Sequence, residues 1–388
     1  MSGSITDNIG TGSGVIAVPV TSTESSSNPT ITTNPATGVG TEWHNTTSGE
    51  IFICTDATAG ANVWTTQLLR NVYGSRGLFG GGTGPHNEID YVQIDTPGNA
   101  TDFGDLSVAR GNMDATDNGQ NGRGVFIGGG INPYSDVIDY VTIANTGNAT
   151  DFGNILTGRY AVAATSNGSN ERGIMFGGVG QPWDGGQNVI QYINISTPGN
   201  SIDFGNLTNS PYMAGACSNG RNDRAVCWGG AGQQPAPSGS GANGISRFMQ
   251  YVTISTPSNA SDFGSELTTG TYPQHGDDGA NAAGCTSNGT LDRGVHCGGD
   301  HASAFNIIQY ITISSIGNAI DFGDLTVASS WTQATSSGEG DRAIVGHIDN
   351  PTNKGIDYFT ISTTGNAADF GELTVARNAG SACSNGMN

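Results

Sequence analysis

The side chains best suited to bind a ligand stand in segments that follow a pair of glycines and differ in length from one repeat of the chain to the next. They are His86, Asn87, Tyr134, Trp183, Asp184 and His301. An aromatic ring beside Asn or Asp is suited to stack on a sugar ring and to bond its hydroxyl groups. Loops that vary on a regular scaffold are also where binding usually occurs. The sequence therefore predicts a ligand-binding loop edge, with the alternative that Tyr134 and Trp183 only cover sheet edges or contact other subunits.

Metal-ligating residue types come closest together in the segment His-Cys-Gly-Gly-Asp-His at 296–301. On a strand, His296 and Cys297 point to opposite faces, so these side chains do not converge on one ion. The pair Asp277-Asp278 and the stretch 114–119 lack the ligand spacing of a calcium loop. We therefore predict no metal site and no cofactor.

The triplet Asp-Phe-Gly occurs in protein kinases, where its Asp holds magnesium, but in this chain it occurs six times. No His-Arg-Asp catalytic loop accompanies it. The single lysine, Lys354, lacks the flanking residues of a phosphate-binding loop. We therefore expect no catalytic residues and no enzymatic activity.

The triplets belong to a repeat of about 50 residues in the order Arg, Gly pair, Ile-x-Tyr and Asp-Phe-Gly. The tyrosines are Tyr91, Tyr140, Tyr192, Tyr251, Tyr310 and Tyr358, and the phenylalanines, 12 residues later, are Phe103, Phe152, Phe204, Phe263, Phe322 and Phe370. Such a repeat with several short strands is typical of a propeller blade, whereas helical repeats carry apolar residues at i, i+3 and i+4. We predict an all-β, six-bladed propeller in which each Phe and Tyr fills the space between neighbouring sheets.

The two ends of the repeat region predict how the ring closes. A whole unit has four strands: a (Ala-x-Ala-x-Ser-Asn-Gly), b (Arg-Gly-x-Phe-x-Gly-Gly), c (Ile-x-Tyr-x-Thr-Ile) and d (Asp-Phe-Gly-x-Leu-Thr). The first unit lacks strand a, and residues 376–386 are a strand a with no unit after it. We predict that this C-terminal strand pairs with residues 76–81, because closure removes exposed sheet edges.

Six arginines open the b strands: Arg76, Arg123, Arg172, Arg224, Arg293 and Arg342. The acidic residues of the triplets are Asp102, Asp151, Asp203, Asp262, Asp321 and Asp369. We hypothesise that each Arg pairs with one such Asp, within a blade or between blades. Breaking a buried pair of this kind costs about 3–5 kcal/mol.

Gly pairs such as Gly80-Gly81 and Gly128-Gly129 follow the b strands. Glycine is expected where backbones converge or where φ turns positive. The last repeat departs from this pattern with Gly346-His347.

The composition limits the classes of partner. A net charge of −20 with one lysine argues against nucleic-acid binding, which needs clustered Lys and Arg. The first 14 residues do not resemble a secretory signal, and no run is long enough to span a bilayer. The six cysteines stand at different repeat positions, which predicts small buried side chains, with a bond between Cys217 and Cys227 as the alternative.

We divide the chain into three parts. Residues 1–40 are rich in Ser, Thr, Gly and Asn, which predicts an extended arm that becomes ordered only against a partner. Residues 41–69 alternate strand-like runs around a Thr-Ser-Gly turn, which predicts a small β-hairpin region. Residues 70–388 form the predicted propeller.

The Gly pair, the downstream Tyr and the one large aromatic residue per repeat resemble kelch-type propellers, although Phe replaces the usual Trp and the spacing from Tyr is longer. The stretches 142–153 and 360–377 share the pattern Thr-Ile-x-x-x-Gly-Asn-Ala-x-Asp-Phe-Gly. They resemble arrays in tail-associated virion proteins of marine bacteriophages. The segment from Trp43 to Trp64 is similar to a short module near the attachment end of phage fibre proteins.

This resemblance implies a bacteriophage virion structural protein of the tail, a fibre or the neck, located in the extracellular virion. The N-terminal arm would contact other virion proteins in a multi-copy assembly, and the propeller would bind a host glycan or protein receptor. Nucleic-acid binding and membrane insertion are not expected. Two alternatives are a secreted or surface carbohydrate-binding propeller and a glycan-active propeller enzyme, which would need converging carboxylates or metal ligands that the sequence does not show.

Overall fold

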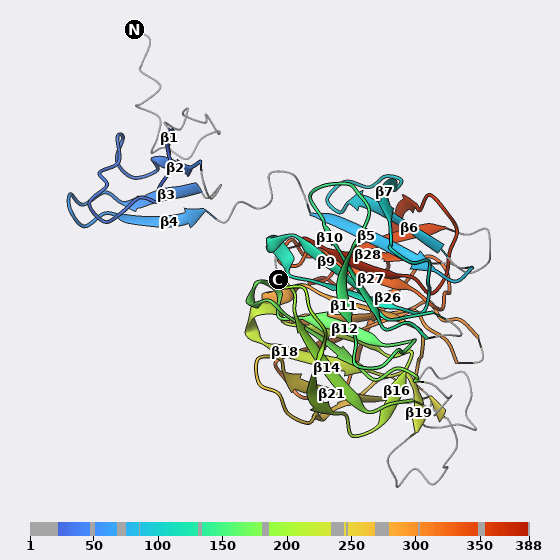
Figure 1. The fold of residues 1–388 in the computed structure, drawn as a ribbon. Helices are drawn as coiled ribbons and strands as arrows, with labels where there is room; N and C mark the ends of the chain where they lie inside the picture. The colour runs from blue at the N-terminus through green and yellow to red at the C-terminus, as the bar shows by residue number, and fades with distance from the viewer. Residues whose placement is uncertain are drawn as a thin grey trace. The chain divides into compact units, whose positions relative to one another are not determined.

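The computed structural model describes residues 22–46, 51–67, 75–84, 86–130, 134–180, 186–233, 244–245, 247–267, 279–301, 303–347 and 354–386. The chain divides into two compact units, Met1–Tyr73 and Gly74–Asn388. Both consist of β-strands joined by turns, and the second unit also contains short 3-10 segments (Figure 1). In the described parts of the chain, no helix has the length and apolar composition that a membrane crossing requires.

The N-terminal unit contains one sheet, in the order β1 (Ser22–Ser25), β2 (Glu42–Asn45), β3 (Ile51–Asp56) and β4 (Val63–Gln67). Strand β1 pairs in parallel with β2, and the other pairs are antiparallel. The rings of Trp43 and Trp64 meet edge to face at 5.9 Å, and their N–H groups donate to the carbonyls of Ser27 and Thr33.

The predicted arm of residues 1–40 therefore differs from the structure over residues 22–40. This segment is not a free extension, because it supplies a strand of the sheet and hydrogen-bond acceptors for both tryptophans. Residues 1–21 lie outside the described residues.

The second unit contains six four-stranded antiparallel sheets, each with its strands in the order a, b, c, d. The first three are β31 (Ser381–Ser384), β5 (Arg76–Gly82), β6 (His86–Gln93) and β7 (Thr101–Asp105); β8 (Asp114–Asp117), β9 (Arg123–Ile127), β10 (Val137–Thr142) and β11 (Thr150–Asn154); and β12 (Ala163–Ser166), β13 (Arg172–Phe176), β14 (Val189–Asn194) and β15 (Ile202–Asn206). The last three are β17 (Gly215–Ser218), β18 (Arg224–Trp228), β21 (Phe248–Thr253) and β22 (Ser261–Ser265); β23 (Gly284–Ser287), β24 (Arg293–Cys297), β25 (Ile307–Thr312) and β26 (Ile320–Asp324); and β27 (Gln333–Ser336), β28 (Arg342–Gly346), β29 (Gly355–Thr360) and β30 (Ala368–Glu372). A small extra sheet joins β16 (Ser210–Tyr212), β19 (Ala231–Gln233) and β20 (Gly244–Ile245).

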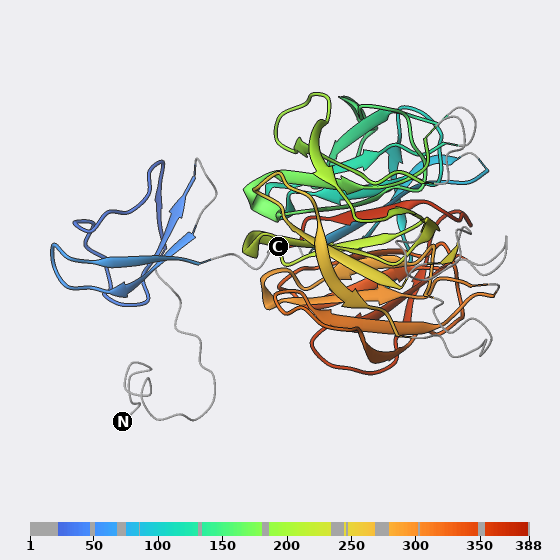
Figure 2. The same ribbon diagram turned by 90° about the horizontal axis from the view of Figure 1, so that it is seen from below.

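The a strands contact one another in a closed cycle: β31, β8, β12, β17, β23, β27 and back to β31. Strand β31 pairs antiparallel with β5, so the red end of this unit lies beside its blue start (Figures 1 and 2). The prediction that the C-terminus supplies the missing strand is confirmed. The arrangement is consistent with the blades of a β-propeller, and we call each four-stranded sheet a blade and the closed cycle the ring.

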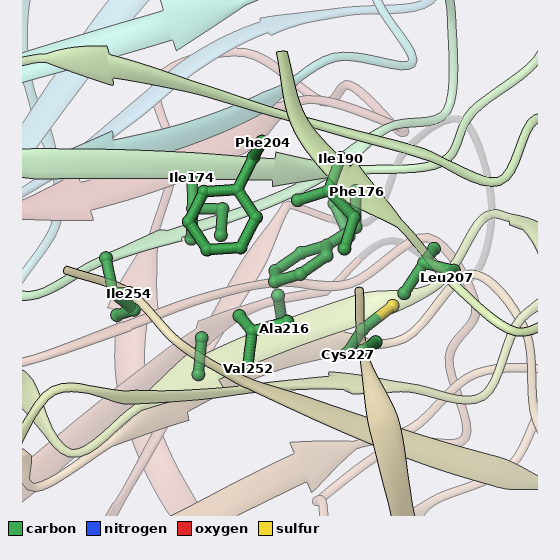
Figure 3. Close-up of a cluster of buried hydrophobic side chains, with 12 residues drawn as sticks. Ile174, Phe176, Ile190, Phe204, Leu207, Ala216, Cys227, Val252 and Ile254 are labelled. Carbon is green, nitrogen blue, oxygen red and sulfur yellow. The ribbon is translucent and has the colours of Figure 1, made fainter. Parts of the chain in front are cut away.

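The apolar core lies between neighbouring blades. In the cluster of Figure 3, Phe204 of the third blade packs with Val252 and Ile254 of the fourth. Every triplet Phe is at most 3% exposed and meets the Tyr of its own blade at centroid distances of 5.9–6.1 Å. The prediction that each Phe fills the space between sheets is confirmed.

The motif that runs from Gly-Asn-Ala to Asp-Phe-Gly joins each blade to the one before it. Backbone N–H groups of Gly147 and Ala149 in the second blade donate to the carbonyls of Phe103 and Asp105 in the first. The Asn148 side chain accepts the N–H of Asp105. The turn therefore covers the outer strand of the preceding blade, where an open edge would otherwise be exposed.

The last glycine of each triplet makes this docking possible. Its φ is between +143° and +152° in all six blades, a conformation that favours glycine. A Cβ atom at Gly153 would lie 2.5 Å from the carbonyl oxygen of Gly199 in the next blade. The triplet is therefore an interblade contact, with the Phe buried, the Asp exposed and the Gly against the neighbouring turn.

The hypothesis of Arg–Asp pairs is wrong. The Arg172 guanidinium lies 4.4 Å from the centre of the Tyr192 ring, and its Nη1 donates to the carbonyls of Ile254 (3.0 Å) and Ser255 (2.8 Å) in the next blade. All six arginines stack in this way at 4.3–5.0 Å and donate to the following blade. The triplet Asp residues are exposed and lie on the outer strands.

The Gly pairs have the expected positive φ, as at Gly128 (+64°) and Gly129 (+95°). In the first blade, however, the equivalent pair is Gly81-Gly82, with φ of +63° and +146°, and the predicted pair Gly80-Gly81 is shifted by one residue. Counting from the arginine that opens the strand shows the reason, because Gly80 occupies the position that Ile127 has in the second blade.

A buried polar residue in strand c forms a second interblade contact. Asp139 accepts the N–H of Ser107 and an Nη1–H of Arg110 at 2.7 Å. Arg377 reaches Asp90 in the same way at 3.0 Å, which joins the last blade to the first. Gln takes the place of this Asp in three blades and still accepts a backbone N–H from the blade before.

The departure of the last repeat from the Gly pair, with Gly346-His347, is explained by the buried polar residue of strand c. His347 stands where the other blades have the first glycine of the pair, and its Nε2 lies 3.1 Å from Asp357. Asp357 is the buried strand c residue of that blade and is 1% exposed. The histidine therefore takes the place of the arginine as its partner.

Candidate binding face and channel mouth

Strand direction sorts the connections of the ring onto two faces. Because a, b, c and d are antiparallel, the b–c and d–a connections lie at one end of each blade, and the a–b and c–d turns at the other. We call these the loop face and the turn face. Hydrogen bonds such as Thr83 N–H to the Asn378 carbonyl and Gly130 N–H to the Gly111 carbonyl join b–c to d–a connections across the loop face.

The structure describes four of the six predicted ligand-binding residues and places them on this face, His86 and Asn87 in the first blade, Tyr134 in the second and His301 in the fifth. His86 begins β6, and its Nδ1 lies 3.1 Å from the carboxylate of Glu88. The carbonyl of Asn87 accepts the N–H of Leu106. The N–H of His301 donates to the carbonyl of Ser303.

The two predicted aromatic contacts have different outcomes. Tyr134 packs against Tyr160 with centroids 4.8 Å apart, beside the buried Val179, so part of its ring supports the loop face itself. Trp183 and Asp184 lie outside the described residues.

The segment 296–301, with its metal-ligating residue types, does not converge on one point. His296 stacks on Trp228 at 5.1 Å, whereas Cys297 belongs to the cluster on the opposite face of its blade with Ile308 and Phe322. Cys217 and Cys227 likewise lie in different clusters and are free thiols. Within the described residues, no group of three or more His, Cys, Asp or Glu is placed to hold a metal ion.

A cavity of about 80 Å³ lies where the six a strands meet at the loop face, and we call it the channel mouth. A second cavity of about 60 Å³ follows along the same strands and is lined by alanines, serines and threonines, together with Cys217, Cys285 and Asp117. The two cavities mark a narrow channel along the ring axis.

Six residues with positive φ surround the channel mouth, one from each blade. They are Asn112, Ala161, Met213, Ala282, Trp331 and Ala379, with φ between +51° and +57°. Each is two residues before its a strand, and five of the six successive pairs are joined by a backbone hydrogen bond, as from Ala161 N–H to the Asn112 carbonyl at 2.7 Å. The backbone is therefore repeated while the side chains differ.

Unpartnered polar atoms gather on one side of the channel mouth. Asn112 Nδ2, both side-chain polar atoms of Gln333 and Ser381 Oγ have no hydrogen-bond partner in the described part of the chain, although these residues are 6%, 3% and 2% exposed. They come from three consecutive blades around the ring. A buried polar atom without a partner costs about 1–3 kcal/mol, so such a cluster needs an explanation.

One carboxyl group also lines this cavity. Asp114 accepts the N–H groups of Ala115 and Ala164 at 2.8 and 2.7 Å, and burial raises its pKa to about 7. No Lys or Arg is among the described residues that line the cavity. The channel mouth therefore suits a neutral or cationic group better than an anion.

A second buried carboxyl group lies between the fourth and fifth blades, away from the channel mouth. Burial raises the pKa of Glu266 to about 8 and lowers that of His296 to about 3. Their Oε1 and Nε2 atoms are 3.7 Å apart, but both groups are neutral at pH 7, so the contact is not an ion pair at that pH. In the second blade, Phe126 stands where this histidine stands, and it packs on Leu106 of the first blade.

The channel mouth was missed in the sequence because its residues do not form a motif. Trp331 and Asn112 are the signal, since each replaces an alanine found at the same repeat position in other blades. The alignment of all six d–a connections would have found them.

The fold and the cavity together define an all-β protein of repeated four-stranded sheets with a polar pocket at the ring axis. No protein-family model matches the chain, and no curated protein matches it.

Proposed function

We propose that this chain is a non-enzymatic structural protein of a bacteriophage virion, in the tail, a fibre or the neck. In this proposal the six blades form a kelch-like β-propeller, closed by its C-terminal strand, that displays the loop face to a host-surface glycan or protein receptor. The virion assignment is supported by the resemblance of the repeats to those of marine phage tail-associated proteins.

The observation that carries the binding role is the division between the two faces. Residues of the turn face and the blade interfaces repeat almost unchanged, because they hold neighbouring blades together. The loop face carries the length differences, the aromatic residues Tyr134 and Trp331, and the unpartnered polar atoms of the channel mouth. Variable loops on a rigid scaffold are the usual arrangement of a binding protein.

The attachment role falls to the N-terminal unit and the residues before it. A four-stranded sheet with strands of four to six residues is small for an independent domain, and its outer strands β1 and β4 have unpaired edges within the described chain. A partner protein that adds a strand at either edge would complete it. Several copies per virion are expected from the symmetry of such particles.

The binding role is tested with a glycan array and with bacterial envelope preparations as probes for the full chain. A His86→Ala, Tyr134→Ala, His301→Ala variant changes the loop face, and an Asp102→Asn, Asp151→Asn variant with the same melting temperature changes exposed residues elsewhere. We expect binding to be lost in the first variant only. Equal binding by all three proteins would contradict the role of the loop face.

The virion assignment needs a separate test, because a secreted carbohydrate-binding propeller would pass the binding screen as well. Antibodies raised against the full chain are applied to phage particles and to bacterial cells from the same culture. The proposal predicts labelling of particles at the tail or neck. Labelling of cell surfaces or of free protein alone would favour the secreted or surface-bound alternative.

A further inference from the structure

We propose that the channel mouth binds the acetamido group of an N-acetylated sugar, with the sugar ring against Trp331. This inference deepens the proposed function and rests on it, because it names the ligand class of the loop face.

The polar wall of the channel mouth suits a ligand that both donates and accepts hydrogen bonds. Asn112 Nδ2 and Gln333 Nε2 are donors, Gln333 Oε1 is an acceptor, and all three lack partners among the described residues. A secondary amide supplies one carbonyl acceptor and one N–H donor in a small neutral group. Ser381 Oγ, also unpartnered there, can take either role.

The opposite wall is apolar and narrow. It consists of small or apolar residues of the third, fourth and fifth blades, among them Ala161, Val162 and Ala283. A methyl group fits this wall, whereas a hydroxyl group would lose its hydrogen bonds there. An amide whose carbonyl side faces Asn112 and whose methyl faces these alanines matches both walls.

The charge of the cavity excludes the commonest small anions. Among the described residues that line it, Asp114 is the one acidic residue, Cys285 is the one thiol, and none is cationic. A carboxylate or phosphate would meet no positive charge there, in a protein whose net charge is −20. A neutral sugar substituent meets no such obstacle.

The size of the cavity selects a substituent rather than a whole sugar. About 15 Å³ is enough to hold one water molecule, and the channel mouth has about 80 Å³. This is room for a group of a few heavy atoms. Trp331 lines the mouth and is partly exposed, so its indole offers a flat surface on which the sugar ring can stack.

The test titrates the full chain with tri-N-acetylchitotriose and, as the matched sugar without acetamido groups, cellotriose, by isothermal calorimetry. Asn112→Ala and Trp331→Ala introduce the residue that three other blades carry at the same position with the same φ, so both variants keep a backbone the ring already uses. Ile316→Ala is the control, because it shortens an exposed side chain on the turn face that does not line the channel mouth.

We expect the chain to bind the acetylated sugar only, with affinity reduced about fivefold by Asn112→Ala and about tenfold by Trp331→Ala, and unchanged by Ile316→Ala. Equal affinity for cellotriose, no binding, or binding that is insensitive to Asn112→Ala and Trp331→Ala would overturn the inference. The envelope-binding screen of the loop-face variant tests the proposed function independently of this titration. Envelope binding that depends on His86, Tyr134 and His301 but not on Asn112 or Trp331 would keep the proposed function and reject the acetamido site.

Discussion

The turn face and the loop face of the ring differ in how strictly their residues repeat. On the turn face, the same hydrogen bonds from the Gly-Asn-Ala turn to the preceding outer strand recur around the ring and also close it between Ala100 and Glu372. On the loop face, the backbone at the channel mouth recurs, but the side chains range from alanine to tryptophan. The residues that hold neighbouring blades together therefore recur in every repeat, whereas the side chains of the loop face differ from blade to blade.

Removal of the closing strand should have the largest effect. Deletion of residues 377–388 takes away β31 and leaves Asp90 buried without Arg377, which alone costs about 3–5 kcal/mol. We expect loss of the cooperative thermal transition of the ring, measured by calorimetry. Deletion of residues 387–388 alone is the control, and a long truncation that melts like the full chain would contradict ring closure.

The docking glycine gives the next largest effect. Gly153→Ala forces a side chain into φ of +143° and into the turn of the next blade, at an expected cost of about 2–5 kcal/mol. Gly199→Ala is matched to it, because that glycine sits on the other side of the same contact, its φ is outside the positive range, and an added Cβ atom would meet nothing within 4 Å. Urea unfolding should separate the two variants, and equal losses would argue that the contact is not specific.

Stability measurements can distinguish the observed stacking of Arg172 on Tyr192 from the rejected Arg–Asp ion pair. Arg172→Ala removes a cation–π contact and two hydrogen bonds to carbonyls, with an expected loss of about 2–3 kcal/mol. Asp203→Asn changes an exposed residue and should alter the free energy of unfolding by less than about 0.5 kcal/mol. A comparable loss in both variants would restore the pairing hypothesis.

The neutral pair between the fourth and fifth blades gives the smallest effect and the opposite sign. Glu266→Leu with His296→Phe introduces the residues found at the junction of the first and second blades. It removes two buried atoms without partners among the described residues, Glu266 Oε1 and His296 Nδ1, and leaves the N–H of Ala280 without the Glu266 oxygen that accepts it. We expect a gain of about 1–3 kcal/mol at pH 8 in urea unfolding. A loss of stability would show that the pair is held by a partner outside the described residues.

The same double variant should also change how the free energy of unfolding depends on pH. The pKa of Glu266 is raised from 4.5 to about 8, so its contribution to the free energy of unfolding falls as pH rises through that interval. The pKa of His296 is lowered from 6.5 to about 3, so its contribution falls as pH drops from 6.5 toward 3. The double variant should show a smaller change of stability in both intervals, and an unchanged pH profile would contradict these shifts.

Much of the fold was predictable because residues that recur at a fixed spacing in the sequence have the same packing environment in every blade. The constant 12-residue interval from Tyr to Phe predicted that strands c and d form one unit in which each Phe is buried. The C-terminal strand was predictable because one unit lacked its first strand and one strand lacked its unit. The Arg–Asp hypothesis failed because the sequence shows that two residue types recur but not that Tyr192 and a carbonyl of the next blade lie closer to Arg172 than any Asp does.

The candidate site was predictable only in part. Loop length indicated the loop face, on which the channel mouth also lies, but the six channel residues are brought together by ring closure, which joins positions as far apart as Asn112 and Ala379. The parallel strand β1 was missed because Ser22–Ser25 has no apolar pattern and is held by a neighbour rather than by its own propensity.

The proposed function places binding on the loop face and not on the turn face. Its most direct test is to block each face in turn in a Cys285→Ala background, using Val108→Cys on the loop face or Ile316→Cys on the turn face, both exposed positions, coupled to a bulky polyethylene glycol maleimide. Binding to the envelope preparation selected in the screen should disappear when Val108→Cys is coupled and persist when Ile316→Cys is coupled. Retained binding in the first case, or loss in the second case alone, would contradict the account.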